Sequence, residues 1–84
     1  MIQDTSRDAY HLLEKVSDKQ LSILHAIAVL HSANDRMIAE ALKWSINRVT
    51  GRRNELVGMG LLTPARKQID PVTKRRVIFW QLNY

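Results

Sequence analysis

Apolar residues recur at helical spacing along the N-terminal half of the chain. Tyr10, Leu13 and Val16 lie three residues apart, which predicts a first short helix over residues 7–16. A second helix is expected over about residues 18–31, where apolar residues cover most of the circumference. A helix of this kind is normally central and buried. Its apolar positions are Leu21, Ile23, Leu24, Ile27, Ala28 and Leu30.

Residues that cap helices mark where the next helices begin. Ser17, with a glutamine three residues later, has the capping-box pattern and opens the second helix. Asn34 offers a cap for a third helix over about residues 35–43. Ser45 is a good N-cap for a fourth helix over about residues 46–58, and two glycines near its end are candidate stops.

The pattern changes from helix to strand after Gly60. Residues 61–69 contain Pro64 and predict an edge strand, because proline removes a ladder donor. Proline stands second in residues 70–73, as a type I turn prefers. Residues 77–82 are β-branched and aromatic, which predicts a second strand.

The order of these elements predicts one domain over residues 1–84, mainly α with a C-terminal β-hairpin at about residues 61–82. This is the layout of a winged helix. Eighty-four residues make one domain at most. A domain this small buries only about 60–65% of its unfolded surface, so we expect a thin core.

Residues 38–49 resemble a helix-turn-helix motif. The small Ala39 lets the second helix of the motif approach, and Leu42 and Val49 hold the two helices together. Lys43 stands in the turn where glycine is common, so the turn departs from the usual pattern.

From residue 35 to residue 82, the chain resembles the small winged helix DNA-binding proteins of bacteriophages and prophages. The segments that carry this resemblance are VTGRRNEL (49–56), GLL (60–62), DPVTKR (70–75) and WQL (80–82). The resemblance implies DNA binding by the fourth helix and the wing. Two positions depart from the family: Lys74 replaces a turn glycine, and Arg53 stands where an apolar residue is usual. A positive φ at Lys74 would cost roughly 1 kcal/mol.

A helical wheel divides the fourth helix into a packed stripe and an outward face. Asn47, Gly51 and Asn54 fall on the outward face, which we expect to meet DNA. Arg53 falls within the packed stripe, so we expect its stem to lie along the core and its guanidinium to meet Glu40 or Asp35. The stripe comprises Ile46, Val49, Arg53, Leu56 and Val57.

The candidate DNA-binding residues come from the fourth helix and the wing. Asn47 can pair bidentately with adenine, and Arg48 or Arg52 can bind guanine or a phosphate. Gly51 either permits close approach to DNA or is a tolerated small residue. The basic wing tip fits phosphate or minor-groove contact, or serves to protect an edge strand. The full set is Ser45, Asn47, Arg48, Thr50, Gly51, Arg52, Asn54, Arg66, Lys67, Lys74, Arg75 and Arg76.

The charges are distributed unevenly over a chain of net charge +5. Residues 1–44 carry five Lys/Arg and six Asp/Glu, whereas residues 45–84 carry eight Lys/Arg and two Asp/Glu. The basic half should therefore be the binding half. A polyanion is its natural partner, because each neutralised phosphate releases a condensed counterion.

The sequence lacks the patterns that are typical of several classes of function. There is no glycine-rich phosphate loop, no triad pattern and no metal spacing among the histidines, so we expect no enzyme, metal, cofactor or small-molecule ligand. The absence of cysteine favours a reducing cytosol. The start has no signal-peptide pattern and no apolar run approaches the ~20 residues that span a bilayer, so we expect a cytoplasmic protein without a membrane partner. Trp44 and Trp80 are expected in the core or at a hinge.

The leading functional interpretation is a sequence-specific regulator that binds double-stranded DNA, acting on transcription and of phage or prophage type. One alternative is the DNA-binding module of a replication or packaging machine. Another is a winged helix that binds an acidic protein. A homodimer is expected if two copies read two half-sites, with the first helix as the extra contact; a monomer whose first helix only covers the core remains open.

Overall fold

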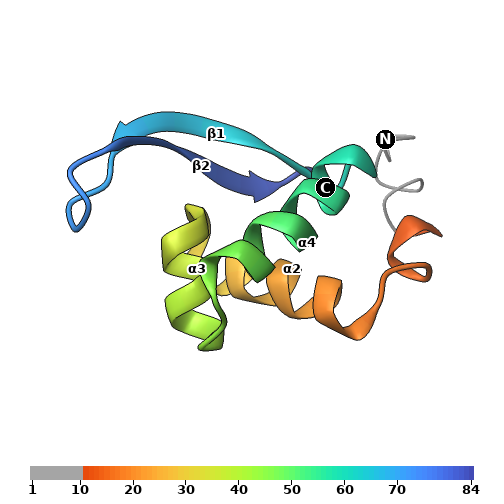
Figure 1. The fold of residues 1–84 in the computed structure, drawn as a ribbon. Helices are drawn as coiled ribbons and strands as arrows, with labels where there is room; N and C mark the ends of the chain where they lie inside the picture. The colour runs from red at the N-terminus through yellow and green to blue at the C-terminus, as the bar shows by residue number, and fades with distance from the viewer. Residues whose placement is uncertain (1–10) are drawn as a thin grey trace.

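The computed structural model describes residues 11–84 of the chain. Residues 11–13 are helical and residues 14–15 form a turn, while the earlier part of the predicted first helix, including Tyr10, lies outside the described residues. Figure 1 shows the helices packed together beneath a long hairpin, the wing, whose tip extends beyond α3. The elements are α2 (Asp18–Leu30), α3 (Asp35–Leu42), α4 (Ile46–Gly58), β1 (Leu62–Ile69) and β2 (Arg76–Leu82).

The predicted polar caps begin all three helices. Ser17 forms a capping box with Gln20, in which each side chain accepts a hydrogen bond from the backbone N–H of the other residue. The Asn34 side chain accepts from the amide three residues later at 2.9 Å, and Ser45 does the same at 3.3 Å. Such caps stabilise helices by about 1 kcal/mol each. They explain why the predicted starts of α2, α3 and α4 are confirmed.

Helix α2 buries only one side. The expectation of a central helix whose apolar residues are buried over most of its circumference is wrong for Leu21, which is 49% exposed, and for Ala28 and Leu30, which are also exposed. The reason is that α3, α4 and β2 pack on the side of α2 where its buried residues lie. Val29 is 64% exposed on the uncovered surface. The buried residues of α2 are Ile23, Leu24, Ala26 and Ile27.

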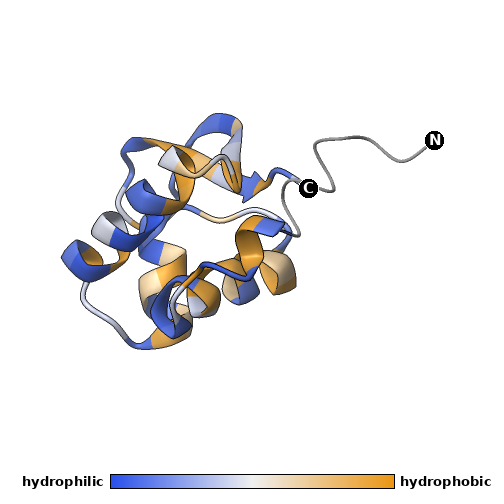
Figure 2. Ribbon diagram, turned by 90° about the vertical axis from the view of Figure 1, so that its right-hand side faces the viewer, coloured by the Kyte–Doolittle hydropathy of each residue, from blue (hydrophilic) through white to orange (hydrophobic). Residues whose placement is uncertain are grey.

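The rest of the core comes from the motif helices and the base of the wing. Ile38 of α3 is completely buried, and so are Val49 and Leu56 of α4, which fall in the predicted packed stripe. Leu61 and Trp80 close the core from the hairpin side. Figure 2 shows how hydrophobic and hydrophilic residues alternate along the helices, so each helix presents one apolar side to this thin core.

The turns depend on backbone conformations that favour glycine. Lys43, between α3 and α4, has φ 59° and ψ 40°, the left-handed conformation usual for glycine at a helix end. Gly60 follows α4 with φ 81°, so it is this glycine, and not Gly58, that turns the chain into the hairpin. The unusual lysine in the motif turn therefore keeps the glycine-type geometry.

The wing is built on an antiparallel ladder with a third, one-residue strand. Ala33, just before α3, exchanges two backbone hydrogen bonds of 2.8 and 3.0 Å with Trp80 of β2. The register of β1 against β2 shifts between Pro64 and Arg66, which is the irregularity expected near a strand proline. Helices α2, α3 and α4 followed by this hairpin form a winged helix fold.

The connection at the tip of the wing is wider than the predicted four-residue turn. The Lys74 amide donates to the Asp70 carbonyl at 2.8 Å, and the Asp70 amide donates to the Arg75 carbonyl at 2.8 Å. Six residues, 70–75, therefore connect the strands, and the first and last of them are joined by this second hydrogen bond. Lys74 has φ 62°, so the strained conformation considered from the sequence is present.

Candidate nucleic-acid interface

The outward face of α4 is open and polar. Asn47, Arg48, Gly51 and Asn54 are exposed, as the helical wheel predicts. A Cβ added at Gly51 would meet no atom within 4 Å, so nothing inside the protein requires glycine there. Ile46 departs from the predicted packed stripe, because it begins the helix and is 50% exposed.

Several candidate residues at the start and on the face of α4 also hold internal partners. Thr50 is half-buried, and its hydroxyl donates to Asp35 at 2.9 Å. The Arg48 guanidinium lies 4.4 Å from the centre of the Trp44 ring. Ser45 caps the helix through its Oγ. Ser45 and Arg48 are exposed, and of the two only the long Arg48 side chain is free of a capping role and can reach a partner.

Arg52 forms an ion pair along the helix. Its Nη1 lies 3.1 Å from both carboxylate oxygens of Glu55, which also accepts a hydrogen bond of 2.9 Å from Gln20 of α2. The hydrogen bond from Gln20, followed by that from Arg52, holds the pKa of Glu55 below its usual value. Glu55 therefore stays ionised and partly offsets the positive charge of Arg52.

Arg53 is turned into the protein, as the sequence predicts. Its Nε and Nη2 donate to the two carboxylate oxygens of Asp35 at 2.9 Å each, and its guanidinium lies 4.4 Å from the centre of the Trp80 ring. The side chain is only 12% exposed. Of the two carboxylates considered, Asp35 is the partner, whereas Glu40 pairs with Arg36. Arg53 thus ties α4 to α3 and to the base of the wing.

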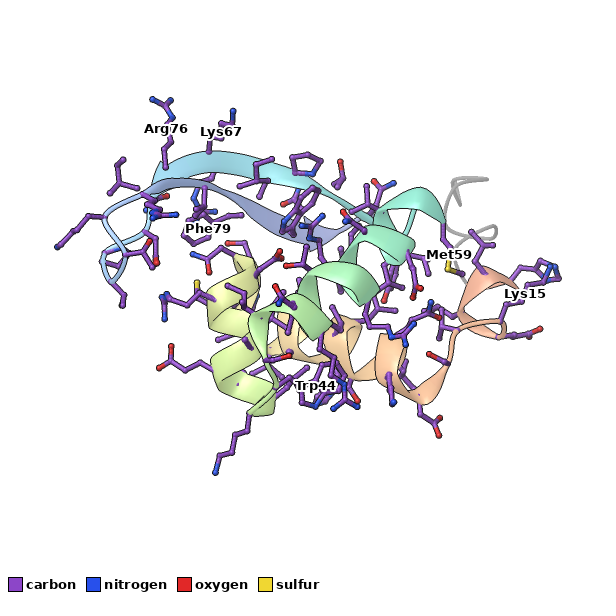
Figure 3. The ribbon with its side chains drawn as sticks, viewed as in Figure 1. Lys15, Trp44, Met59, Lys67, Arg76 and Phe79 are labelled. Atoms are coloured by element: carbon purple, nitrogen blue, oxygen red, sulfur yellow. The ribbon has the colours of Figure 1, made fainter. Side chains whose placement is uncertain are left out.

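The five cations of the wing do not share one environment. Arg66 turns back to the body, where it lies 4.6 Å from the centre of the Phe79 ring and donates to the Ser32 hydroxyl at 2.9 Å. Lys67 and Arg76 extend from the wing away from the helices (Figure 3). These two side chains, with the exposed Lys74 and Arg75 of the tip, form the cationic surface of the wing.

Asp70 and Arg36 are an unpredicted feature of the interface. Arg36 Nε and Nη2 donate to the Asp70 carboxylate at 2.8 and 2.9 Å, across 34 positions of sequence. The hydrogen bond from Arg36 holds the pKa of Asp70 well below its usual range, and the same contact raises the pKa of Arg36. A proline next to Asp70 predicts a turn, and no local pattern indicates its distant partner.

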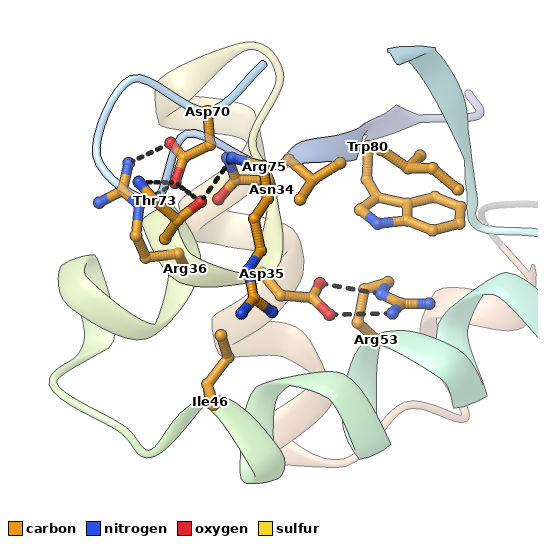
Figure 4. A pocket seen from close by; sticks show the side chains of 11 residues that line it. Asn34, Asp35, Arg36, Ile46, Arg53, Asp70, Thr73, Arg75 and Trp80 are labelled. Atoms are coloured by element: carbon orange, nitrogen blue, oxygen red, sulfur yellow. Dashed lines mark hydrogen bonds and ion pairs between the residues drawn. The ribbon is translucent and has the colours of Figure 1, made fainter. Parts of the chain in front are cut away.

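A cavity of about 590 Å³ separates the wing from the first turns of α3 and α4 (Figure 4). Ile46 of α4 and Arg75 of the wing tip both line it, so the two predicted DNA-binding elements border one space. Asn34 also lines the cavity, and its Nδ2 is buried without a hydrogen-bond partner among residues 11–84. Trp80 forms part of the wall.

The described residues also bear on metal and membrane binding. Residues 11–84 contain no group of three or more histidine, cysteine, aspartate or glutamate side chains that could hold a metal ion. Within the same residues, no helix has the length and apolar character needed to cross a membrane.

Comparison with known proteins places the fold. No family description and no curated protein matches the chain. Among solved structures, a MarR family regulator from Neisseria meningitidis is similar, with a TM-score of 0.63 and 21% sequence identity. The similarity covers 92% of this chain and 51% of that one, so this chain spans about half the length of its structural neighbour. At this level of identity the comparison establishes the winged helix fold.

Proposed function

We propose that this protein is a DNA-binding regulator that reads double-stranded DNA with α4 and holds the phosphate backbone with the wing. One observation carries the proposal: the exposed face of α4 is polar and free of large apolar side chains around Gly51, and it stands in a basic half of the chain. Asn47 presents an amide group of the kind that pairs with base edges, whereas Asn54 offers its Nδ2, because its Oδ1 accepts from Arg53 Nη1 at 2.5 Å.

The charge and shape of the wing support the same function. Lys67, Lys74, Arg75 and Arg76 are exposed cations, and the one acid of the tip, Asp70, is already neutralised by Arg36. Cations on a projecting hairpin suit phosphate or minor-groove contact. A protein-binding surface would more often show an aromatic residue or methionine at its centre.

At the finer level, we propose a transcription regulator of phage or prophage type. The structural neighbour is a regulator by its name, which supports regulation in general. A module of a replication or packaging machine remains the alternative, since it would use the same DNA-binding face. A selection of bound duplexes from a random pool identifies the preferred site, and the location of that site at a promoter, or instead at a replication origin or packaging site, distinguishes these functions.

Salt dependence of binding to a duplex tests the DNA-binding function itself. With roughly four to six phosphate contacts, the slope of log K against log salt should be about −4 to −5. Lys15→Ala is a matched control for Arg76→Ala, because each removes one cation and the two residues lie at opposite ends of the molecule (Figure 3). Arg76→Ala should reduce the slope by about 1, and Lys15→Ala should leave it unchanged.

A flat salt dependence, or stronger binding to an acidic protein than to any duplex, would overturn the DNA-binding proposal.

We further propose a homodimer on DNA, because one small module offers a short footprint and two copies would read half-sites about one helical turn apart. Sedimentation of the free protein and of its complex with the selected duplex tests this. A protein that sediments as one copy in both states is a monomer.

A further inference from the structure

Two consecutive residues in the first turn of α3 bind side chains of α4 and of the wing, which are the two elements proposed to contact DNA. Asp35 binds Arg53 and Thr50 of α4, and Arg36 binds Asp70 at the start of the wing tip. Because the two residues are consecutive, the helix and the wing are fixed to one short piece of backbone (Figure 4).

The Arg36–Asp70 contact has the features of a strong and directional pair. The two guanidinium nitrogens meet the two carboxylate oxygens at 2.8 and 2.9 Å, which is the bidentate arrangement that fixes orientation as well as distance. Asp70 is 1% exposed, and its Oδ2 also accepts from the amide and the hydroxyl of Thr73 at 3.2 and 3.0 Å. One carboxylate therefore shapes the tip and attaches it to α3.

Little else attaches the tip to the helices. Within the part of the chain that the structure describes, Arg36–Asp70 is the one ion pair that joins the wing to the helical body. Residues 71–76 are all exposed. The contacts of Arg53 with Trp80 and of Arg66 with Ser32 lie farther along the strands, toward the base of the wing. The direction of the tip is therefore set by this pair.

We propose that Arg36 and Asp70 are positioning residues for DNA binding, which orient the wing so that its cations reach the backbone while α4 occupies the groove. The inference rests on the proposed function. Neither residue needs to touch DNA, because the effect acts through Lys74 and Arg75, which flank the attached turn.

A positioning role and simple electrostatics predict opposite changes in duplex affinity for one substitution. Asp70→Asn removes a negative charge, so electrostatics alone predicts tighter binding to a polyanion. Loss of the bidentate pair releases the tip and predicts weaker binding. Glu40→Gln is the matched control, since it removes the other carboxylate that contacts Arg36 and leaves the contact with Asp70 in place.

Duplex affinities of these variants form the test. Asp70→Asn should weaken binding roughly tenfold, within the range of coupling energies between residues of one network. Its salt slope should fall in magnitude by about 2, because the tip no longer brings two cations to phosphates. Glu40→Gln should bind as tightly as the unaltered protein or more tightly. Affinity that rises equally in both variants would overturn the proposal.

A second variant, Arg36→Lys, tests the proposal even if the Asp70→Asn variant does not fold. Arg36→Lys preserves the net charge but loses the planar fork that binds both carboxylate oxygens. It should fold and bind the duplex a few-fold more weakly, with a smaller salt slope. A folded Arg36→Lys variant with the original affinity and slope would show that the pair does not position the wing.

A double-mutant cycle separates positioning from general damage. Arg75→Ala should weaken binding in the original protein but have little further effect when combined with Asp70→Asn, because the released tip already fails to deliver that cation. Additive losses would contradict the proposal while leaving DNA binding intact. If the unaltered protein binds no duplex, the proposed function itself fails.

Discussion

At the level of single residues, helix α4 combines inward and outward arginines in consecutive positions. Arg52 pairs with Glu55 on the helix surface, whereas Arg53 is fixed between Asp35 and Trp80. The sequence predicts this difference because position 53 falls among apolar residues on the wheel. It does not predict which carboxylate is the partner, since that depends on how α3 and α4 cross.

Arg53→Met tests the structural role of Arg53. The substitution keeps an apolar stem but leaves the poorly exposed Asp35 without its cation, so the free energy of unfolding should fall by about 3 kcal/mol. Urea denaturation measures the change. DNA affinity should stay within a few-fold at temperatures where the variant is folded. The opposite pattern, with binding lost and the melting temperature unchanged, would mean that Arg53 faces the DNA.

Gly51→Ala addresses the alternative left open for the glycine on the outward face. Since a Cβ at this position has open space around it, alanine should stabilise the helix by about 1 kcal/mol. If α4 approaches DNA closely at Gly51, the same methyl group should weaken duplex binding. A variant that is more stable and binds equally well would identify Gly51 as merely a tolerated residue.

At the level of elements, the sequence indicates where helices and strands lie better than which of their sides are covered. Local caps at Ser17, Asn34 and Ser45 determine where helices start, and such signals lie within a few residues. The exposure of Leu21 and Val29 follows from the arrangement of other elements around α2, which has no local signal. The Arg36–Asp70 pair is unpredictable for the same reason.

Substitutions in α4 and in the wing should affect DNA binding in different ways. Asn47→Ala should weaken binding to the preferred duplex by about 1–3 kcal/mol and relax the sequence preference, because an amide that pairs with a base is lost. Arg75→Ala should weaken binding to all duplexes alike, since phosphates carry no sequence. Competition between the selected duplex and a scrambled one measures both effects. If Asn47→Ala leaves the preference for the selected duplex unchanged, α4 is not the element that recognises the base sequence.

Acid should loosen the wing through Asp70. The pKa of this carboxyl is lowered in the folded protein by the hydrogen bond from Arg36, so its contribution to stability is complete above its usual pKa and is lost as the pH falls below it. Unfolding followed from pH 6 down to pH 2 should therefore show a decline that begins near about pH 4. Asp70→Asn should flatten this decline, and an equally steep decline would show that other carboxylates cause it.

At the level of the whole molecule, the predicted order of elements and the winged helix fold are confirmed by the structure and its neighbour. The outward face of α4 follows from helical periodicity alone. The roles of the individual wing cations do not follow from the sequence, because Arg66 contacts Phe79 and Ser32 whereas Arg76 extends away from the helices. Assigning them requires the register and twist of the hairpin.

The single-residue strand at Ala33 has a consequence for internal motion. Ala33 and Trp80 exchange both of their backbone hydrogen bonds, and both residues are buried. Breaking either bond requires the start of α3 and the centre of the sheet to separate, which is close to global opening. The amide protons of Ala33 and Trp80 should accordingly belong to the slowest class in hydrogen–deuterium exchange, while those of residues 71–74 exchange quickly. The helices and the base of the wing would then move as one rigid body, while the tip of the wing is flexible.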